Sequence, residues 1–242
     1  MIRTAIAALG ILLALTAGAS GQKEPQGAGG LVMELPFDLA LEAQDLLIAP
    51  EEVRVRYTFR HRGDEPATVG FSLPRGEETI DPDSISVTLD GAALEPETLV
   101  GDGLWKGVIA PGATATVELR YRPAVEEASF GEAEINAILI GADDWGRDYC
   151  MNDRLAPRLA RLLEAAKAEG RETLTARRVD YALSRDLDWA GVIDRLIVTM
   201  HPGEDGTIFA CVNGRGQAST QPLTIDRRGV VPSADIRFLI LS

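Results

Sequence analysis

The stretch EEVRVRYTFRHR, residues 51–62, carries the strongest structural pattern in the chain. Its apolar and polar side chains alternate with a period of two, which is typical of a β-strand with one buried and one solvated face. β-Branched and aromatic residues, which favour strands, fill the apolar face. That face carries Val53, Val55, Tyr57 and Phe59, and the other carries Arg54, Arg56, Thr58 and Arg60. The stretch therefore predicts an antiparallel sheet with one face in water.

Similar patterns lie on both sides of this stretch. Residues 63–66 read as a turn and residues 67–73 as a returning strand, so we expect a hairpin. Residues 31–40 and 46–48 are expected to be two separate strands. Further strands follow at spacings of about ten residues as far as Tyr121, separated by Gly, Pro and Asp turns. Residues 31–125 are therefore predicted to form an N-terminal β-sandwich.

The remaining part, residues 126–242, is predicted to be a second β-rich unit with one helix. Residues 130–140 are expected to be its first strand. The helix is expected at about 153–169, where leucines recur at helical spacing and Asn152 or Asp153 can cap the start. The predicted fold class is therefore mainly β, with two β-sandwich-like units and one amphipathic helix at the start of the second.

The first residues have the form of a Sec-type secretory signal. Arg3 precedes an apolar run at residues 5–15, which is too short to span a membrane, and a small-residue cleavage signal ends at Ala19. Residues 1–19 are thus predicted to be a signal peptide and residues 20–30 a flexible leader, with an uncleaved anchor as the alternative. We expect a periplasmic or secreted protein that keeps no stable membrane span after cleavage.

The charge of the chain limits its partners. The formal net charge is −13, so a nucleic acid, whose binding requires basic side chains, is not expected as a partner. The same charge argues against electrostatic adhesion to anionic lipid. The simplest interpretation of the acidity is a soluble, self-repelling surface.

Two cysteines, Cys150 and Cys211, are the only ones in the chain. In an exported protein we expect them to be paired in a disulfide. Such a bridge would close a loop of about 60 residues and contribute roughly 4 kcal/mol by the chain-entropy model. A metal site or a catalytic thiol is the alternative, but two cysteines alone do not complete a zinc site and neither lies in a Cys-x-x-Cys motif.

No catalytic constellation stands out. His61 and His201 are the only histidines, and structural roles are expected for both. No glycine-rich phosphate loop is present, and no cofactor or metal is expected.

An acidic loop is the one cluster of side chains that could carry out binding or catalysis. Close carboxylates beside a tryptophan could bind Ca²⁺ or a sugar, or act as an acid/base pair, although an acidic loop in an acidic protein needs no special explanation. Trp189 is expected in the core near the disulfide, with an exposed ligand contact as the alternative. The possible binding residues are Asp143, Asp144, Trp145, Asp148 and Trp189.

Several segments, in their order along the chain, resemble the bacterial domain-of-unknown-function family 4424. They include residues 46–59, Phe71-Ser72-Leu73-Pro74, Tyr121-Arg122-Pro123, Tyr149-Cys150, Trp189-Ala190-Gly191, Phe209-Ala210-Cys211 and Pro232-Ser233-Ala234-Asp235. The resemblance covers nearly the whole mature chain. It implies an exported bacterial protein and supports the pairing of Cys150 with Cys211, but it supplies no catalytic residue and no ligand.

Two functions remain open from the sequence. The first is a non-catalytic exported module that binds a protein or an envelope component through its loops. The second is a hydrolase or carbohydrate-active protein that uses the acidic loop 143–148. The lack of a catalytic constellation favours the first.

Overall fold

The computed structural model describes residues 28–29, 32–34, 38–72, 80–99, 102–123, 125–140, 149–151, 154–183, 192–212, 215–231 and 236–242. In these residues the chain forms three β-sheets and two helices, which confirms the predicted mainly β fold class. The helices are α1 (Glu132–Leu139) and α3 (Ala156–Ala168).

The largest sheet, called the outer sheet below, has seven strands. In order across the sheet they are β16 (Leu223–Val230), β13 (Ile193–Met200), β3 (Leu39–Ile48), β4 (Val53–His61), β10 (Thr114–Pro123), β6 (Ile80–Leu89) and β7 (Ala92–Ala93). Most neighbours are antiparallel, but β13 and β3 run parallel.

Two further sheets lie against the inner face of the outer sheet. The middle sheet has the order β1 (Ala28–Gly29), β12 (Leu174–Ala182), β17 (Ile236–Leu241), β14 (Thr207–Val212) and β15 (Arg215–Ser219), with β11 (Glu126–Phe130) also paired to β12. The small sheet has the order β2 (Val32–Glu34), β5 (Ala67–Ser72), β9 (Asp102–Ile109) and β8 (Glu97–Leu99).

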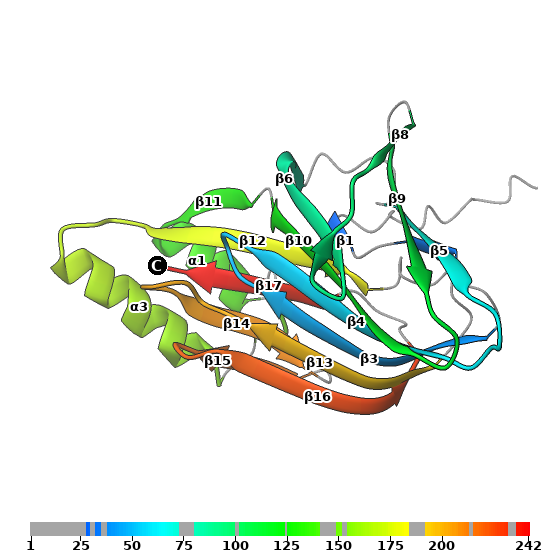
Figure 1. The fold of residues 1–242 in the computed structure, drawn as a ribbon. Helices are drawn as coiled ribbons and strands as arrows, with labels where there is room; N and C mark the ends of the chain where they lie inside the picture. The colour runs from blue at the N-terminus through cyan, green and yellow to red at the C-terminus, as the bar shows by residue number, and fades with distance from the viewer. Residues whose placement is uncertain are drawn as a thin grey trace, which may run out of the picture.

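Two hydrophobic clusters show how these layers stack. One cluster joins the inner face of the outer sheet to the small sheet and to one face of the middle sheet. The other joins the opposite face of the middle sheet to α1 and α3. Along β17, Phe238 and Ile240 belong to the first cluster, whereas Leu239 and Leu241 belong to the second. The middle sheet is therefore buried on both faces, with the helices at one end of the molecule and the small sheet at the other (Figure 1).

The burial of β4 confirms the alternation that the sequence shows. Its odd-numbered side chains are buried from Val53 to His61, and its even-numbered ones are exposed or half-buried. β10 has the same alternation and pairs with β4. One face of the outer sheet is thus core and the other is open to solvent.

The predicted hairpin between residues 51–62 and 67–73 is wrong. β4 pairs with β3 and β10, whereas β5 pairs with β9 and β2. The chain therefore passes from the outer sheet to the small sheet at residues 62–66. The reason is that both strands have an apolar face, and both bury it in the same core cluster from opposite sheets.

The strands predicted at 31–40 and 46–48 are confirmed only in part. β2 lies within the first, but β3 runs without interruption from Leu39 to Ile48 and includes the second. Its pairing with β4 shifts by one residue between Leu41 and Ala43, which is a β-bulge. The bulge moves the buried positions from odd to even numbers, so that Leu41 and then Gln44 point inward. A strict period of two cannot detect a strand that changes phase in this way.

The predicted helix at about 153–169 is confirmed as α3, but residues 132–139 form a helix and not the predicted strand. Ile135 and Ile138 lie three residues apart and both are buried against α3 and the middle sheet. Glu134 accepts a hydrogen bond of 2.9 Å from the backbone N–H of Gly131, which caps the start of α1. The segment is short and apolar, and such segments are ambiguous between strand and helix.

Strands from both sides of residue 125 share the outer sheet, since β13 pairs with β3. The division into units at 31–125 and 126–242 stays a prediction about how the chain folds. Neither helix in the described residues is long and apolar enough to cross a membrane.

Candidate functional site

The predicted binding residues Asp143, Asp144, Trp145, Asp148 and Trp189 lie outside the described residues. The hypothesis of a hydrolase built on them therefore stays a prediction. The described residues show no group of three or more His, Cys, Asp or Glu side chains that could hold a metal ion.

The predicted disulfide between Cys150 and Cys211 is confirmed, with a Cα–Cα distance of 5.1 Å. It ties the segment before α3 to β14 in the middle sheet, 61 residues along the chain. The neighbouring strand β15 approaches the backbone of Cys150 so closely that a side chain at Gly216 would collide with the Cys150 backbone oxygen. The disulfide thus holds the helical layer onto the middle sheet.

His61 is fully buried at the end of β4. Its Nδ1 donates to the backbone oxygen of Ala110 at 2.9 Å, and its Nε2 lies 3.0 Å from the Asp38 carboxylate. The hydrogen bonds to Ala110 and Asp38 raise the pKa of His61 above its ordinary value, although burial acts in the opposite direction. These contacts are those of a structural histidine.

His201 has a local contact in the turn between β13 and β14. Its Nδ1 accepts a hydrogen bond of 3.1 Å from the backbone N–H of Gly203. An open groove of about 1040 Å³ surrounds this turn, lined by charged side chains of both signs. Its two arginines already pair with carboxylates, Arg171 with Glu169 and Arg177 with Glu127.

The solvent face of the outer sheet gathers arginines, although the whole chain is acidic. Every cationic side chain placed on this face by the strand registers is an arginine, and carboxylates lie between them. The arginines are Arg54, Arg56, Arg60, Arg120, Arg122, Arg195 and Arg228, and the carboxylates are Glu42, Asp45, Asp81, Glu118 and Asp226. An arginine guanidinium is planar and suits two-pronged binding of carboxylates.

Most of these arginines are already paired. Glu118 accepts from Arg56 at 2.9 Å and from Arg120 at 2.6 Å, and it is only 12% exposed. Burial opposes the ionisation of Glu118, but the hydrogen bonds and charges of Arg120 and Arg56 outweigh it and hold its pKa below the ordinary value. One carboxylate thus serves two arginines at the centre of the face.

The same face has further ion pairs at its margins. They are Arg60 with Glu42, Arg122 with Asp81, and Arg195 with Asp226. Each of these pairs is partly exposed, so each contributes little to stability. Each pair occupies the guanidinium group that it contains.

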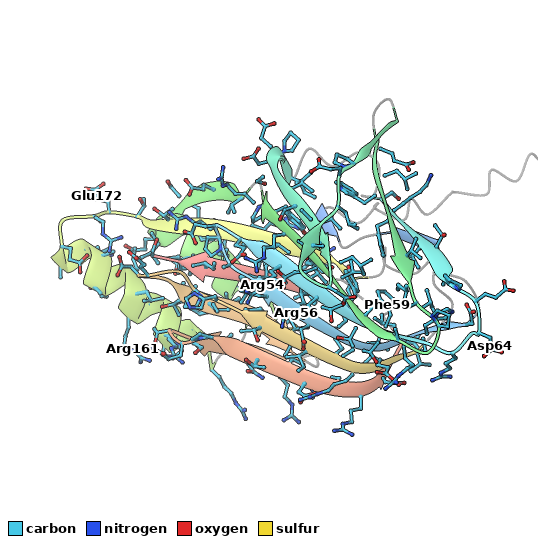
Figure 2. The ribbon with its side chains drawn as sticks, viewed as in Figure 1. Arg54, Arg56, Phe59, Asp64, Arg161 and Glu172 are labelled. Carbon is cyan, nitrogen blue, oxygen red and sulfur yellow. A yellow bond between two sulfur atoms is a disulfide. The ribbon has the colours of Figure 1, made fainter. Side chains whose placement is uncertain are left out.

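Arg54 is the exception at the centre of the face. Within the described parts of the chain it has no hydrogen-bond or ion-pair partner. Its cross-strand neighbours are Leu47 on β3 and Arg120 on β10, and neither can accept a hydrogen bond from it through its side chain. Arg54 and Arg56 lie along β4 in the middle of the molecule (Figure 2).

A shallow trough of about 230 Å³ lies beside Arg54. It is lined by Asp45, Leu46, Leu47, Arg54, Arg56, Ile197 and Thr199. The trough follows β3, whose outward side chains are shorter than the arginines on β4. It therefore combines the unpaired guanidinium of Arg54, one carboxylate and an apolar wall from Leu47 and Ile197.

Sequence reasoning missed this trough. The outward arginines of residues 54–60 were visible in the alternating pattern. Which of them lacks a partner depends on the register of β4 with β3 and β10, and on the bulge in β3. Those pairings join residues far apart in the sequence.

Comparison with known proteins gives a family and a fold. A family model described as "Domain of unknown function (DUF4424)" matches residues 22–90 and 98–239. A search of curated proteins finds no significant match.

Two solved structures are similar to the chain at 10% sequence identity. The first, from Legionella pneumophila and described as a "putative nutrient binding protein", has a TM-score of 0.50 over 88% of this chain and 70% of that chain. The second is an M1 zinc metallopeptidase from Deinococcus radiodurans, with a TM-score of 0.29 over 85% of this chain and 42% of that chain. The first likeness concerns the fold alone, and the second is too weak to support an inference.

Proposed function

The chain belongs to the family described as Domain of unknown function (DUF4424), and from that premise we propose that it is an exported, non-catalytic binding protein. Its partner would be another protein or a component of the cell envelope. The similarly folded protein from Legionella pneumophila is described with a binding role, which is compatible with this proposal. The sequence segments quoted above, in their order along the chain, resemble this same family.

The observation that carries the proposal is the open guanidinium of Arg54 beside an apolar wall. The trough around it is smaller than the roughly 300–1,000 Å³ typical of small-molecule pockets. Its size suits one side chain or one short group of a larger partner. Arginine is enriched at the energetic centres of interfaces, where it binds carboxylates in a defined geometry.

The disulfide and the first residues of the chain support a location outside the cytoplasm. A disulfide between Cys150 and Cys211 is typical of extracytoplasmic proteins. Residues 1–19 would act as the signal peptide that exports the chain. A periplasmic or secreted protein would meet its partner outside the cytoplasm.

Photo-cross-linking in the native bacterium tests the proposal. A photoreactive phenylalanine analogue at Thr199 lines the trough, and we expect it to give one defined adduct with the partner. Arg54→Ala should reduce the yield of that adduct at least about fivefold, which corresponds to roughly 1 kcal/mol of binding free energy. Mass spectrometry of the adduct would identify the partner.

Two controls distinguish specific recognition at the trough from non-specific cross-linking. Arg60→Ala removes an arginine of the same face that pairs with Glu42 outside the trough, and it should leave the adduct unchanged. The same photoreactive residue at Arg161, an exposed position on α3, should give no adduct. Equal adducts from Thr199 and Arg161, or a yield that ignores Arg54→Ala, would reject the proposal.

A further inference from the structure

β16 forms one edge of the outer sheet, and it is the longest edge strand among the described residues. It has eight residues and pairs with β13 on one side only. The opposite edge of the same sheet, β7, has two residues, and the edge strands of the other sheets have five or fewer. Short edges protect sheets from unwanted pairing, and β16 lacks this protection.

The free edge of β16 is also open in space. No described strand receives the backbone N–H and C=O groups that point away from β13. A Cβ atom added at Gly229 would meet no atom within 4 Å. About half of the backbone groups of an edge strand point outward, so β16 can form a ladder with one more strand.

The charge at this edge is positive. Arg227 and Arg228 are exposed, and among the described residues Arg227 donates only to the neighbouring backbone oxygen of Asp226, at 3.0 Å. Asp226 is already bound by Arg195 through two hydrogen bonds, of 2.8 and 3.2 Å. Side chains tipped with nitrogen project beyond β16 in Figure 2. Although the chain has a net charge of −13, this edge is positive and would attract an acidic segment.

We propose that β16 receives an extended acidic segment of a partner protein, which joins the outer sheet as an additional strand. Backbone hydrogen bonds would supply the affinity, and pairing of Arg227 and Arg228 with carboxylates would supply the selectivity. This inference goes beyond the proposed function, because it names a second docking site and does not require the trough at Arg54.

A second copy of the chain is a poorer occupant. Two bodies that each carry a net charge of −13 repel one another. A short acidic segment experiences mainly the local charge of the edge, because interactions beyond about 10 Å are screened at ordinary ionic strength.

Model peptides test the proposal on the full mature protein. Arg227 and Arg228 lie on opposite faces of β16, because they are neighbours along a strand. The probe is therefore an eight-residue valine–glutamate peptide with blocked ends, in which two adjacent glutamates place a carboxylate on each face. We expect it to slow amide hydrogen exchange in residues 223–230 at least about tenfold, as measured by NMR, because outward amides become hydrogen-bonded. The same peptide with lysine in place of each glutamate should have no effect. An N-methylated valine–glutamate peptide, which cannot donate backbone hydrogen bonds, should bind at least about tenfold more weakly.

Charge reversal at the edge gives the matching variant. The double variant Arg227→Glu/Arg228→Glu should lose at least about tenfold in affinity for the valine–glutamate peptide. The control Arg62→Glu/Arg161→Glu makes the same change in net charge at exposed sites elsewhere, and should keep the affinity. Arg54→Ala should also keep it, which separates this site from the trough.

Three results would overturn the proposal. One is equal binding of the N-methylated peptide, since that would be attraction without a ladder. Another is unchanged exchange in residues 223–230, which would leave Arg227 and Arg228 as charges that only protect the edge. The third is a concentration-dependent dimer abolished by Arg227→Glu/Arg228→Glu, which would assign the edge to a second copy.

Discussion

At the residue scale, His61 joins the end of β4 to the turn between β9 and β10. Both of its ring nitrogens face oxygen atoms, those of Ala110 and Asp38. A carbonyl and a carboxylate oxygen only accept hydrogen bonds, so both nitrogens must carry hydrogen for both bonds to form. The folded chain therefore favours the protonated imidazolium, which agrees with the raised pKa of His61.

This contact makes the stability of the protein depend on pH. Because the folded-state pKa of His61 is raised, its contribution is fully present below the unfolded value of about 6.5 and is lost as the pH rises through the raised value. We expect the free energy of unfolding, measured by urea titration, to fall across this window. His61→Gln should remove this part of the pH dependence. An equally steep fall in the variant would assign the effect to another group.

Gly63 supports the same contact by having no side chain. A Cβ atom at this position would collide with the Asp38 carboxylate and approach Nε2 of His61. Gly63→Ala should therefore lower the free energy of unfolding by about 1–3 kcal/mol, the usual cost of overpacking. The control Glu65→Ala changes an exposed residue of the same turn and should have little effect. Chemical denaturation of both variants checks this, and equal stabilities would contradict it.

Single residues were predictable from sequence where only local pattern mattered. The alternating faces of residues 53–60 and the structural nature of His61 follow from their neighbours in the chain. The partners of His61 do not, because Asp38 and Ala110 lie 23 and 49 residues away. The free guanidinium of Arg54 was hidden for the same reason.

At the element scale, the predictable elements are those with a constant period. β4 and α3 keep one period throughout, and each was predicted near its observed place. β3 changes phase at its bulge and was divided into pieces. α1 has eight residues, too few for a helical period to stand out against a strand.

The disulfide is an element-scale constraint with a measurable contribution. It links the segment before α3 to β14 across 61 residues, and the chain-entropy model assigns about 4 kcal/mol to a loop of that length. The double variant Cys150→Ala/Cys211→Ala should lower the free energy of unfolding by about 2–4 kcal/mol in guanidinium titrations. Adding a reductant should destabilise the natural protein to a similar extent and leave the double variant unchanged. A variant as stable as the natural protein would contradict this role.

At the scale of the whole molecule, the sequence predicts sheets packed face to face but not their stacking. Residues 238–241 are apolar without alternation, which is typical of a strand buried on both faces. The helices then cover the face of the middle sheet that the outer sheet leaves open. Such stacking depends on long-range pairing, such as that between β3 and β13, which local patterns do not encode.

The division at residue 125 can be tested on a fragment. Residues 31–125 alone keep β4, β10 and β5 but lose β13 as the neighbour of β3. If the division describes a folding unit, the fragment should unfold in one cooperative transition, at a lower urea concentration than the full chain. Circular dichroism and tryptophan fluorescence should report the same midpoint. A fragment with no cooperative transition would reject the division.

The parallel pairing of β3 with β13 also determines how late in synthesis the outer sheet can be completed. Ala43 pairs with Arg195. After β3 has been synthesised, about 150 more residues must therefore be made before its neighbouring strand β13 is available. At roughly 5–20 residues per second, the ribosome needs about 8–30 s for that length. During this time one side of β3 has no strand to pair with, and an unpaired strand invites aggregation. Chaperones that keep the nascent chain unfolded until β13 has been made would therefore raise the yield of this protein.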